Sequence, residues 1–322
     1  MLMHSSYIVL STKMTNRHNL LLWSVATALI VFTHGEGTNK TTAPEGKLMS
    51  MNAITYDKLP MDNRAGYKAG LRTYKFLSIV KAFDADGSGK FCTGALIGPR
   101  AVVTLASCLH KAGTTTLYGT VEVAEGSFSR SYAEYRYPIK LTKDTTVYIH
   151  KSFDETKLNT VADKLISLNN IAVIVLPIDV SNLTDIVPVA VEEGIATSRL
   201  RTIGYGRNRV LGERNQYLRE IDVIPETLET CKKTLDNTIC DSPDLIVTTG
   251  KYTKRESLCH LEDGAPLVLR SAILKRKSLV GLGMAIHVTN DNTCNEDVNL
   301  SVFLNLKPYK AWLKSILDNI PK

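Results

Sequence analysis

From Tyr74 onward the chain consists of short apolar runs divided by turn residues. Residues 76–83 and 91–97 are two such runs, and the segment 84–89, rich in Asp and Gly, separates them. Runs of this length with such boundaries are typical of β-strands joined by hairpin turns. The segment also resembles the start of a calcium-binding loop, but Ala95 stands where that loop requires a bidentate glutamate, so a hairpin is favoured. The pattern predicts an all-β body.

The last stretch of the chain has a different period. Its apolar residues are Tyr309, Trp312, Leu313, Ile316, Leu317 and Ile320. This spacing places them on one face of a helix. We therefore predict a C-terminal α-helix over residues 308–319 that packs on the β body.

The N-terminus has the composition of a secretory leader. Lys13 and Arg17 precede an apolar run over 20–32, and the short segment 33–35 offers a small-residue cleavage site. The run is short for a membrane span, which disfavours the alternative of an uncleaved signal anchor. We expect residues 1–35 to be a signal peptide, the protein to be secreted and extracellular, and no stable membrane insertion.

Six cysteines follow the leader, at Cys92, Cys108, Cys231, Cys240, Cys259 and Cys294. An even number behind a signal peptide predicts a disulfide framework, although spacing alone leaves the pairing open. Asn39, Asn182 and Asn299 each begin a glycosylation sequon, which predicts a glycoprotein with these residues at its surface. Residues 36–66 are polar, contain no cysteine, and read as a flexible N-terminal extension.

The charge of the chain is mildly basic. It has 39 Lys and Arg against 32 Asp and Glu, a formal net charge of +7. No block of like charge is long enough for a nucleic-acid arm, so nucleic acid is not an expected partner. A positive balance of this size permits contact with anionic glycans without requiring it.

The segment Cys259–Val268 reads Cys-His-Leu-Glu-Asp-Gly-Ala-Pro-Leu-Val. It resembles the nucleophile motif of the chymotrypsin-like (trypsin-like) serine proteases, Cys-x-Gly-Asp-Ser-Gly-Gly-Pro-Leu-Val. Further segments resemble the family's other motifs in the required order, at 103–108, 149–154, 170–176, 203–206 and 280–286. The resemblance covers residues 74–318 and implies two antiparallel six-stranded β-barrels followed by a C-terminal helix.

The resemblance also implies the organisation of the chain. The protease-like domain would span 67–322, with a first barrel over about 70–178 and a second over about 185–305. The disulfides implied are Cys92–Cys108, Cys231–Cys240 and Cys259–Cys294.

At the positions that the resemblance assigns to a Ser-His-Asp triad, this chain has other residues. Asp263 stands in the nucleophile position, Ser107 in the histidine position and Asn170 in the aspartate position. The triad requires a hydroxyl whose proton passes to an imidazole held by a buried carboxylate. A serine cannot accept that proton at neutral pH, and an asparagine has no charge with which to hold an imidazole. The resemblance therefore implies a catalytically inactive homologue.

The surroundings of the triad are altered as well. Leu261 stands where a glycine aims an N–H into the oxyanion hole, and Glu262 where an aspartate pairs with a newly cut N-terminus. Ser257 takes the base of the specificity pocket, so binding of Lys or Arg is not predicted. Arg64 is the nearest candidate for an activation cleavage, and it is a weak one.

The strand that pairs with a substrate backbone in the family is represented by Met284, Ala285 and Ile286, and Ser301 replaces a pocket glycine. We expect Ile286 to fill part of the pocket. His110 lies two residues beyond Cys108 and is expected to be an ordinary surface histidine.

The resemblance implies a secreted, non-catalytic serine protease homologue of the arthropod secreted type. Such a protein would act by binding, as a cofactor, decoy or regulator of active proteases or as a component of a secreted fluid. The expected partners are other secreted proteins, active serine proteases among them. No cofactor is implied, and no metal site is expected because no spacing of His, Cys and Asp matches one.

Two alternatives compete with this interpretation. One is a hydrolase with a rebuilt site, in which Ser107 is the nucleophile and the other groups come from His260, Glu262, Asp263 and His287. It is disfavoured because reach and alignment must hold together. The other is a glycan-binding protein with two basic tips, formed by Arg207, Arg209, Arg214 and Arg219 and by Lys275, Arg276 and Lys277. It is disfavoured because charge runs are ordinarily solvated turns.

Overall fold

The computed structural model describes residues 46–50, 67–68, 73–111, 114–126, 133–154, 168–181, 183, 188–191, 200–205, 218–235, 237–250, 263–270, 277–289 and 300–321. Residues 46–50, 67–68 and 286–289 are described by their backbone alone. All of these residues belong to one compact unit, Ala43–Lys322, and the expected signal peptide lies outside the described residues.

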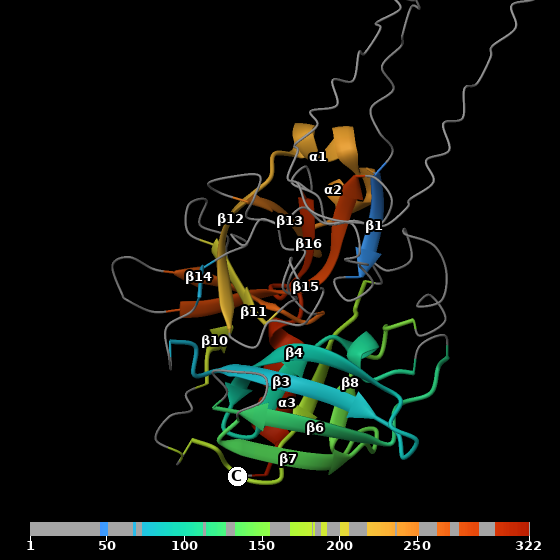
Figure 1. Ribbon diagram of the computed structural model, residues 1–322, viewed down its shortest axis with the longest axis vertical. Coiled ribbons are helices and arrows are strands. Elements are labelled where there is room, and N and C mark those ends of the chain that lie inside the picture. The colour runs from blue at the N-terminus through green and yellow to red at the C-terminus, as the bar shows by residue number, and fades with distance from the viewer. Residues whose placement is uncertain are drawn as a thin grey trace, which may run out of the picture. The chain divides into compact units, whose positions relative to one another are not determined.

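The first sheet has seven antiparallel strands in the order β7-β6-β3-β4-β5-β9-β8 (Figure 1). The strands are β3 (Leu77–Phe83), β4 (Gly89–Gly98), β5 (Ala101–Thr104), β6 (Thr120–Glu125), β7 (Tyr135–Lys140), β8 (Val147–Ile149) and β9 (Ala172–Val175). Consecutive residues of β4, β5 and β9 are buried, so both faces of these strands are covered, and their apolar side chains belong to the hydrophobic core.

The second sheet closes on itself. Its strands run β15-β14-β11-β12-β13-β16, and a further pairing of β15 with β16 completes a six-stranded barrel. Their bounds are β11 (Leu200–Gly204), β12 (Arg219–Pro225), β13 (Leu245–Gly250), β14 (Pro266–Arg270), β15 (Lys277–Thr289) and β16 (Leu300–Asn305). Three short strands join this barrel from outside, β1 (Gly46–Ser50), β2 (Tyr67–Lys68) and β10 (Ala190–Val191).

The predicted fold class is confirmed: the chain is mostly β, with the arrangement of a trypsin-like fold and few helices. The two sheets differ in closure. Within the described residues, the outer strands of the first sheet, β7 and β8, share no pairing, so that sheet stays open, whereas the second sheet is a closed barrel.

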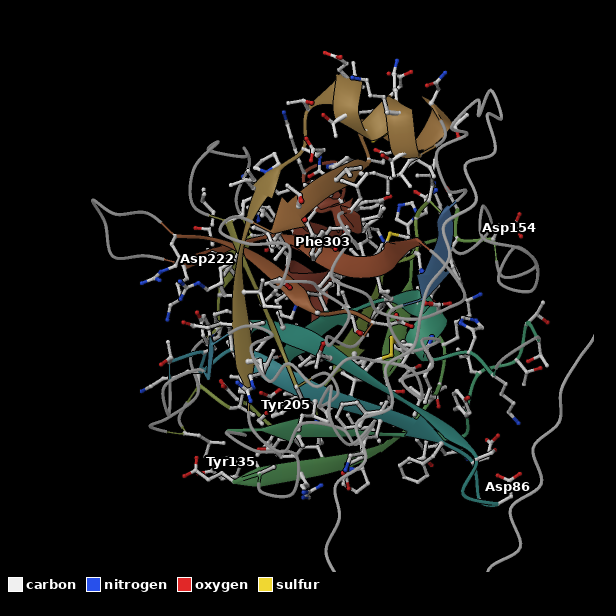
Figure 2. The ribbon with its side chains drawn as sticks, turned by 45° about the horizontal axis from the view of Figure 1, so that its top comes forward. Asp86, Tyr135, Asp154, Tyr205, Asp222 and Phe303 are labelled. Carbon is white, nitrogen blue, oxygen red and sulfur yellow. A yellow bond between two sulfur atoms is a disulfide. The ribbon has the colours of Figure 1, made fainter. Side chains whose placement is uncertain are left out.

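The predicted hairpin is present as β3 and β4. Its turn has Gly87 at φ +82°, a left-handed conformation that glycine adopts without strain. Asp86 accepts hydrogen bonds from the backbone N–H and the hydroxyl of Ser88, at 2.8 and 2.6 Å. Asp84 accepts one from the backbone N–H of Gly119 at 2.9 Å. The acidic residues therefore brace the turn, whose tip carries Asp86 at the edge of the molecule (Figure 2).

The described helices are the short η1 (Ala106–Cys108), α1 (Leu228–Thr234), α2 (Asn237–Cys240) and the C-terminal α3 (Lys310–Asn319). Two disulfides connect elements: Cys92–Cys108 joins β4 to η1, and Cys231–Cys240 joins α1 to α2. Their S–S distances are 2.07 and 2.03 Å. The third implied pair, Cys259–Cys294, lies outside the described residues.

The C-terminal helix begins at Lys310, two residues later than predicted, and packs on the body through Leu313 and Ile316. The hydroxyl of Tyr309 accepts a hydrogen bond from the backbone N–H of Asn169 at 3.0 Å. The ring of His150 meets Tyr309 edge-on, with centroids 5.3 Å apart. Within the described part of the chain, no helix is long and apolar enough to cross a membrane.

The N-terminal extension contains a strand. Residues 36–66 were expected to be flexible, yet Gly46–Ser50 pairs antiparallel with Ala285–Thr289 of β15. Such pairing needs backbone groups only, so a polar segment without an amphipathic pattern gives little sign of it.

The core is apolar, with Tyr205 and Phe303 among the largest fully buried side chains (Figure 2). An acidic side chain of the first sheet also lies in the core. Glu125, at the end of β6, is fully buried, and one of its carboxyl oxygens accepts a hydrogen bond from Ser78 at 2.5 Å. Its other oxygen has no partner among the described residues. Burial holds the pKa of the Glu125 carboxyl well above its ordinary value.

This buried carboxyl predicts a pH-dependent stability. Because the folded state holds the proton more tightly than the unfolded chain, the free energy of unfolding falls as pH rises from the ordinary glutamate pKa toward the folded one. Glu125→Gln removes this titration. The difference in Tm between Glu125→Gln and the wild type should shift in favour of the variant by a few degrees as the pH is raised from 4 to 8. A change of 1 kcal/mol corresponds to about 2–4 °C for a domain of this size.

Thermal unfolding across that pH range measures the effect. Ser78→Ala is the matched control, since it removes the hydrogen bond that lowers the pKa of Glu125 and should keep or steepen the fall. Parallel curves for the wild type and Glu125→Gln would contradict the prediction.

Candidate functional site

The site begins with the turn that precedes β14. Gly264 has φ +80°, and a Cβ added to it would meet the carbonyl oxygen of Thr93 at 2.2 Å and Oγ1 of Thr104 at 2.9 Å. Thr93 donates its backbone N–H to the carbonyl of Asp263 at 3.0 Å, and Gly264 donates its own to Gly283 at 2.8 Å. The turn is therefore wedged between β4 of the first sheet and β15 of the second, and only glycine fits.

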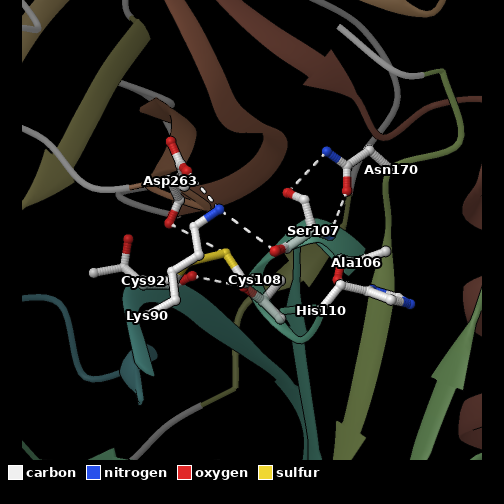
Figure 3. A network of polar contacts seen from close by, with 10 residues as sticks. Lys90, Cys92, Ala106, Ser107, Cys108, His110, Asn170 and Asp263 are labelled. Carbon is white, nitrogen blue, oxygen red and sulfur yellow. Dashed lines mark hydrogen bonds and ion pairs between the residues drawn. A yellow bond between two sulfur atoms is a disulfide. The ribbon is translucent and has the colours of Figure 1, made fainter. Parts of the chain in front are cut away.

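The carboxylate of Asp263 forms an ion pair with Lys90. The Oδ2–Nζ distance is 3.0 Å, and the side chain of Asp263 is only 3% exposed (Figure 3). Lys90 lies on β4, as does Thr93, so the same strand holds both the backbone and the charge of this turn. A buried carboxylate is costly without a counter-charge, and the ammonium supplies one.

The same ammonium group contacts the second position. Lys90 Nζ donates to the carbonyl oxygen of Ser107 at 3.4 Å. Ser107 lies in η1, next to Cys108, whose disulfide to Cys92 fastens η1 to β4. Figure 3 shows the lysine between Asp263 on one side and η1 on the other.

Ser107 is joined to the third position by two hydrogen bonds. Its backbone N–H donates to Oδ1 of Asn170 at 2.8 Å, and Nδ2 of Asn170 donates to its hydroxyl at 3.1 Å. Asn170 is 2% exposed, just before β9. Because the amide oxygen serves a backbone donor, the amide N–H is directed to the hydroxyl oxygen. Both ends of the amide are thus used, which an aspartate could not do.

The structure therefore brings Ser107, Asn170 and Asp263 into one network through Lys90. Within the described residues, the partner of the Ser107 hydroxyl is an amide donor, which cannot accept a proton. The cation beside it is an ammonium, which also donates. The arrangement is suited to holding three elements together, and among the residues that the structure describes it supplies no general base to Ser107.

His110 is not the surface residue that the sequence suggested. It is 2% exposed, its Nδ1 lies 2.8 Å from the carbonyl oxygen of Ala106, and its ring packs against Phe153. The expectation was wrong because His110 forms a β-bridge with Leu117, and its side chain is buried at that position. The histidine serves the local fold of η1.

Several predicted site residues can be placed and others cannot. Met284 and Ala285 are buried in β15, and Ser301 is buried on β16. Ile286 is described by its backbone, which pairs with Met49 and Ser301, so its filling of a pocket stays a prediction. Outside the described residues lie Arg64, Ser257, His260, Leu261 and Glu262, and the sequon residues Asn39, Asn182 and Asn299.

The two expected basic tips are represented by Arg219 and Lys277, since the other residues named for them lie outside the described part. Lys277 is not a solvated tip. Its ammonium donates to the carbonyl oxygen of Thr73 and lies 4.5 Å from the ring centroid of Tyr74. Burial lowers its pKa. Lys277 therefore packs the start of β15 against the chain that leads into β3.

A family model described as Trypsin matches residues 73–313, more than half of the chain. The chain belongs to the trypsin family. Among its relatives, azurocidin of Homo sapiens is 24% identical over 264 residues, which cover 80% of this chain and 88% of azurocidin. A venom serine protease of Polistes dominula is 25% identical over 214 residues, covering 65% of this chain and 70% of the wasp protein.

Sequence reasoning did not find Lys90 in this trypsin-family domain. The residue stands between Gly89 and Phe91 at the start of β4, where a lysine is unremarkable. The signal was indirect: an aspartate at a buried motif position requires a cation, and the motif itself contains no lysine or arginine.

Loss of this cation should be costly. Lys90→Ala leaves the carboxylate of Asp263 buried without its ammonium partner, and we expect a loss of about 2–4 kcal/mol in the free energy of unfolding, since a quarter of the lysine side chain is exposed. The double variant Lys90→Ala/Asp263→Asn removes the charge as well and should be more stable than the single one. Denaturant unfolding measures both.

Lys81→Ala is the matched control. Lys81 lies on neighbouring β3 and pairs with Glu122 at 3.4 Å in a more exposed position, so its loss should cost about 0–1 kcal/mol. Equal effects of Lys81→Ala and Lys90→Ala, or a double variant less stable than Lys90→Ala, would argue against a buried ion pair.

Proposed function

We propose that the chain is a secreted, non-catalytic member of the trypsin family that acts by binding other proteins. It would serve as a cofactor, decoy or regulator of active proteases, or as a component of a secreted fluid. The observation that carries the proposal is the Lys90 ammonium group. It pairs with Asp263 and contacts Ser107, at two of the positions where the resemblance places a nucleophile and its base.

The chemical argument follows from what acyl transfer needs. A nucleophile must lose a proton to a neighbouring base, and loss of a whole triad costs on the order of a million-fold in turnover. Here the groups at those positions are an amide, a hydroxyl that accepts from that amide, and a carboxylate bound to an ammonium. Each is engaged with another as a structural contact, so a single substitution would not create a catalytic pair.

Secretion is supported by three further observations. The Cys92–Cys108 and Cys231–Cys240 disulfides are bonds that persist in oxidising compartments, and a leader-like segment opens the sequence. One relative is named for a venom, which is a secreted fluid. The arthropod type of the homologue is part of the same proposal.

The absence of catalysis can be tested with an active-site serine probe such as a fluorophosphonate. We expect no labelling of the purified full chain, no labelling of Ser107→Ala, and peptide hydrolysis lower than that of an active trypsin-family control by at least about 10⁵-fold. Labelling of the wild type that disappears in Ser107→Ala would establish a rebuilt nucleophile and overturn the proposal.

The binding role has its own test. The cleavage rate of a protein substrate by an active serine protease from the same fluid is measured with increasing amounts of the chain. We expect a saturable rise or fall of at least about two-fold, as for a cofactor or a decoy that binds its protease. Albumin at equal concentration controls for crowding. Rates that do not change, across the proteases of that fluid, would contradict regulation of proteases.

A further inference from the structure

Two cations lie opposite each other on the second barrel. Arg270, the last residue of β14, pairs with Lys277, the first residue of β15, at the left margin of this barrel in Figure 1. Directly opposite residues on antiparallel strands share a face, with Cβ atoms roughly 4.5–5.5 Å apart, and like charges placed so destabilise the pair. The sequence has no aspartate or glutamate anywhere in 264–290. An anion between the two side chains would therefore be stabilising.

The carboxylates on the same face of the barrel are already in use. Arg201 of the neighbouring β11 pairs with β14 two residues before Arg270, which places it on this face. Its guanidinium binds the carboxylates of Glu220 and Asp222, each at 2.5 Å. Among the residues that the structure describes, neither Arg270 nor Lys277 forms an ion pair with a carboxylate. The face thus has two cations whose charge the described part of the chain does not neutralise.

The Lys277 ammonium group is held in place by its neighbours. It donates to the carbonyl oxygen of Thr73 and lies 4.5 Å from the ring centroid of Tyr74, whose hydroxyl donates to Glu220. The objection that charge runs are solvated turns therefore does not apply to this residue. Burial and the nearby charge of Arg270 lower the pKa of Lys277. A cation that is fixed and partly desolvated loses less entropy and less hydration when it binds an anion.

The surroundings of the two cations indicate which kind of anion fits. Cores of protein–protein interfaces are rich in apolar and aromatic side chains and poor in charge. Among the described residues, the exposed large hydrophobic ones are Leu168, Ile178 and Leu228, and none of these lies on β14 or β15. Arg270 is exposed, and a guanidinium beside an ammonium matches the oxygens of a sulfate group. A polyanion with repeated sulfate groups therefore fits this face better than an acidic protein segment.

We propose that Arg270 and Lys277 bind a sulfate group of an extracellular glycan chain, so that this face of the second barrel is a glycan-binding surface. The guanidinium donates two parallel N–H groups to the sulfate oxygens, and the ammonium completes the contact from β15. The formal net charge of +7 adds a weaker attraction from the rest of the surface.

The inference goes beyond the proposed function, since it concerns a glycan and not a protease. It shares with that proposal only secretion, which brings the chain to the compartment where sulfated glycans occur. Its readouts involve no protease and no substrate turnover. A chain without effect on any protease would leave the glycan site intact, and a failed glycan site would leave the case against catalysis unchanged.

The test measures the binding of a heparin octasaccharide to the purified full chain at about 0.15 M salt. Arg270→Glu reverses the exposed charge and supplies a carboxylate that competes for Lys277, so we expect binding at least about tenfold weaker than in the wild type. Lys277→Gln keeps a donor for the carbonyl of Thr73 but loses the charge, and should bind at least about threefold more weakly.

Lys233→Glu on α1 and Lys314→Glu on α3 are the matched controls. Both residues are exposed, and their reversal changes the net charge as much as Arg270→Glu does. Their affinity for heparin should stay within about twofold of the wild type, because charges far from the site are screened. Heparin should also raise the Tm of the wild type and of both controls but not that of Arg270→Glu, since a ligand stabilises the state that binds it. The Tm of each variant without heparin shows that it is folded.

Three outcomes would overturn the inference. The first is a wild type that does not bind the octasaccharide at this salt concentration. The second is an equal loss of affinity in Arg270→Glu and in the two controls, which would mean that only the total charge matters. The third is binding of polyglutamate or of fully desulfated heparin as tight as that of heparin, which would mean that the site has no use for sulfate and that an acidic protein segment fits it equally well.

Discussion

The contact that the site depends on is the close approach of Gly264 to Thr93. No side chain fits between them, so the turn before β14 can lie only with its backbone against β4. That placement carries Asp263 into a buried position, and Lys90 on the same strand β4 lies within reach of its carboxylate. Both sheets therefore contribute to one small junction, in which the close approach to Thr93 and Thr104 leaves space only for glycine at position 264.

The ion pair at this junction has an asymmetric energetic effect. A buried pair stabilises a fold only modestly relative to apolar residues, but the loss of either partner is severe. An Asp263→Ser substitution would leave the ammonium of Lys90 without its counter-charge beside Ser107. Lys90 contacts both Asp263 and Ser107, and Ser107 is bonded to Asn170, so a substitution at one of these four positions removes a contact of at least one other.

Much of the architecture could be predicted from the sequence. The hairpin of β3 and β4 had turn residues between apolar runs, the C-terminal helix had an apolar face, and the motifs around Cys259 identified the family. The missed features depend on contacts between distant segments. Lys90 and Asp263 each have an ordinary local context, His110 is buried by a bridge to Leu117, and the pairing of β1 uses backbone groups that no residue pattern reveals.

The position of β1 has a consequence for biosynthesis. This strand leaves the ribosome well before its partner β15, since Gly46–Ser50 pairs with Ala285–Thr289 much further along the chain. Pairings between segments so distant in sequence form late, because a long loop must close first. The barrel must therefore assemble before its own first strand is seated. During that interval the edge of β15 is open to the strands of neighbouring nascent chains, which makes it a place where crowding favours aggregation.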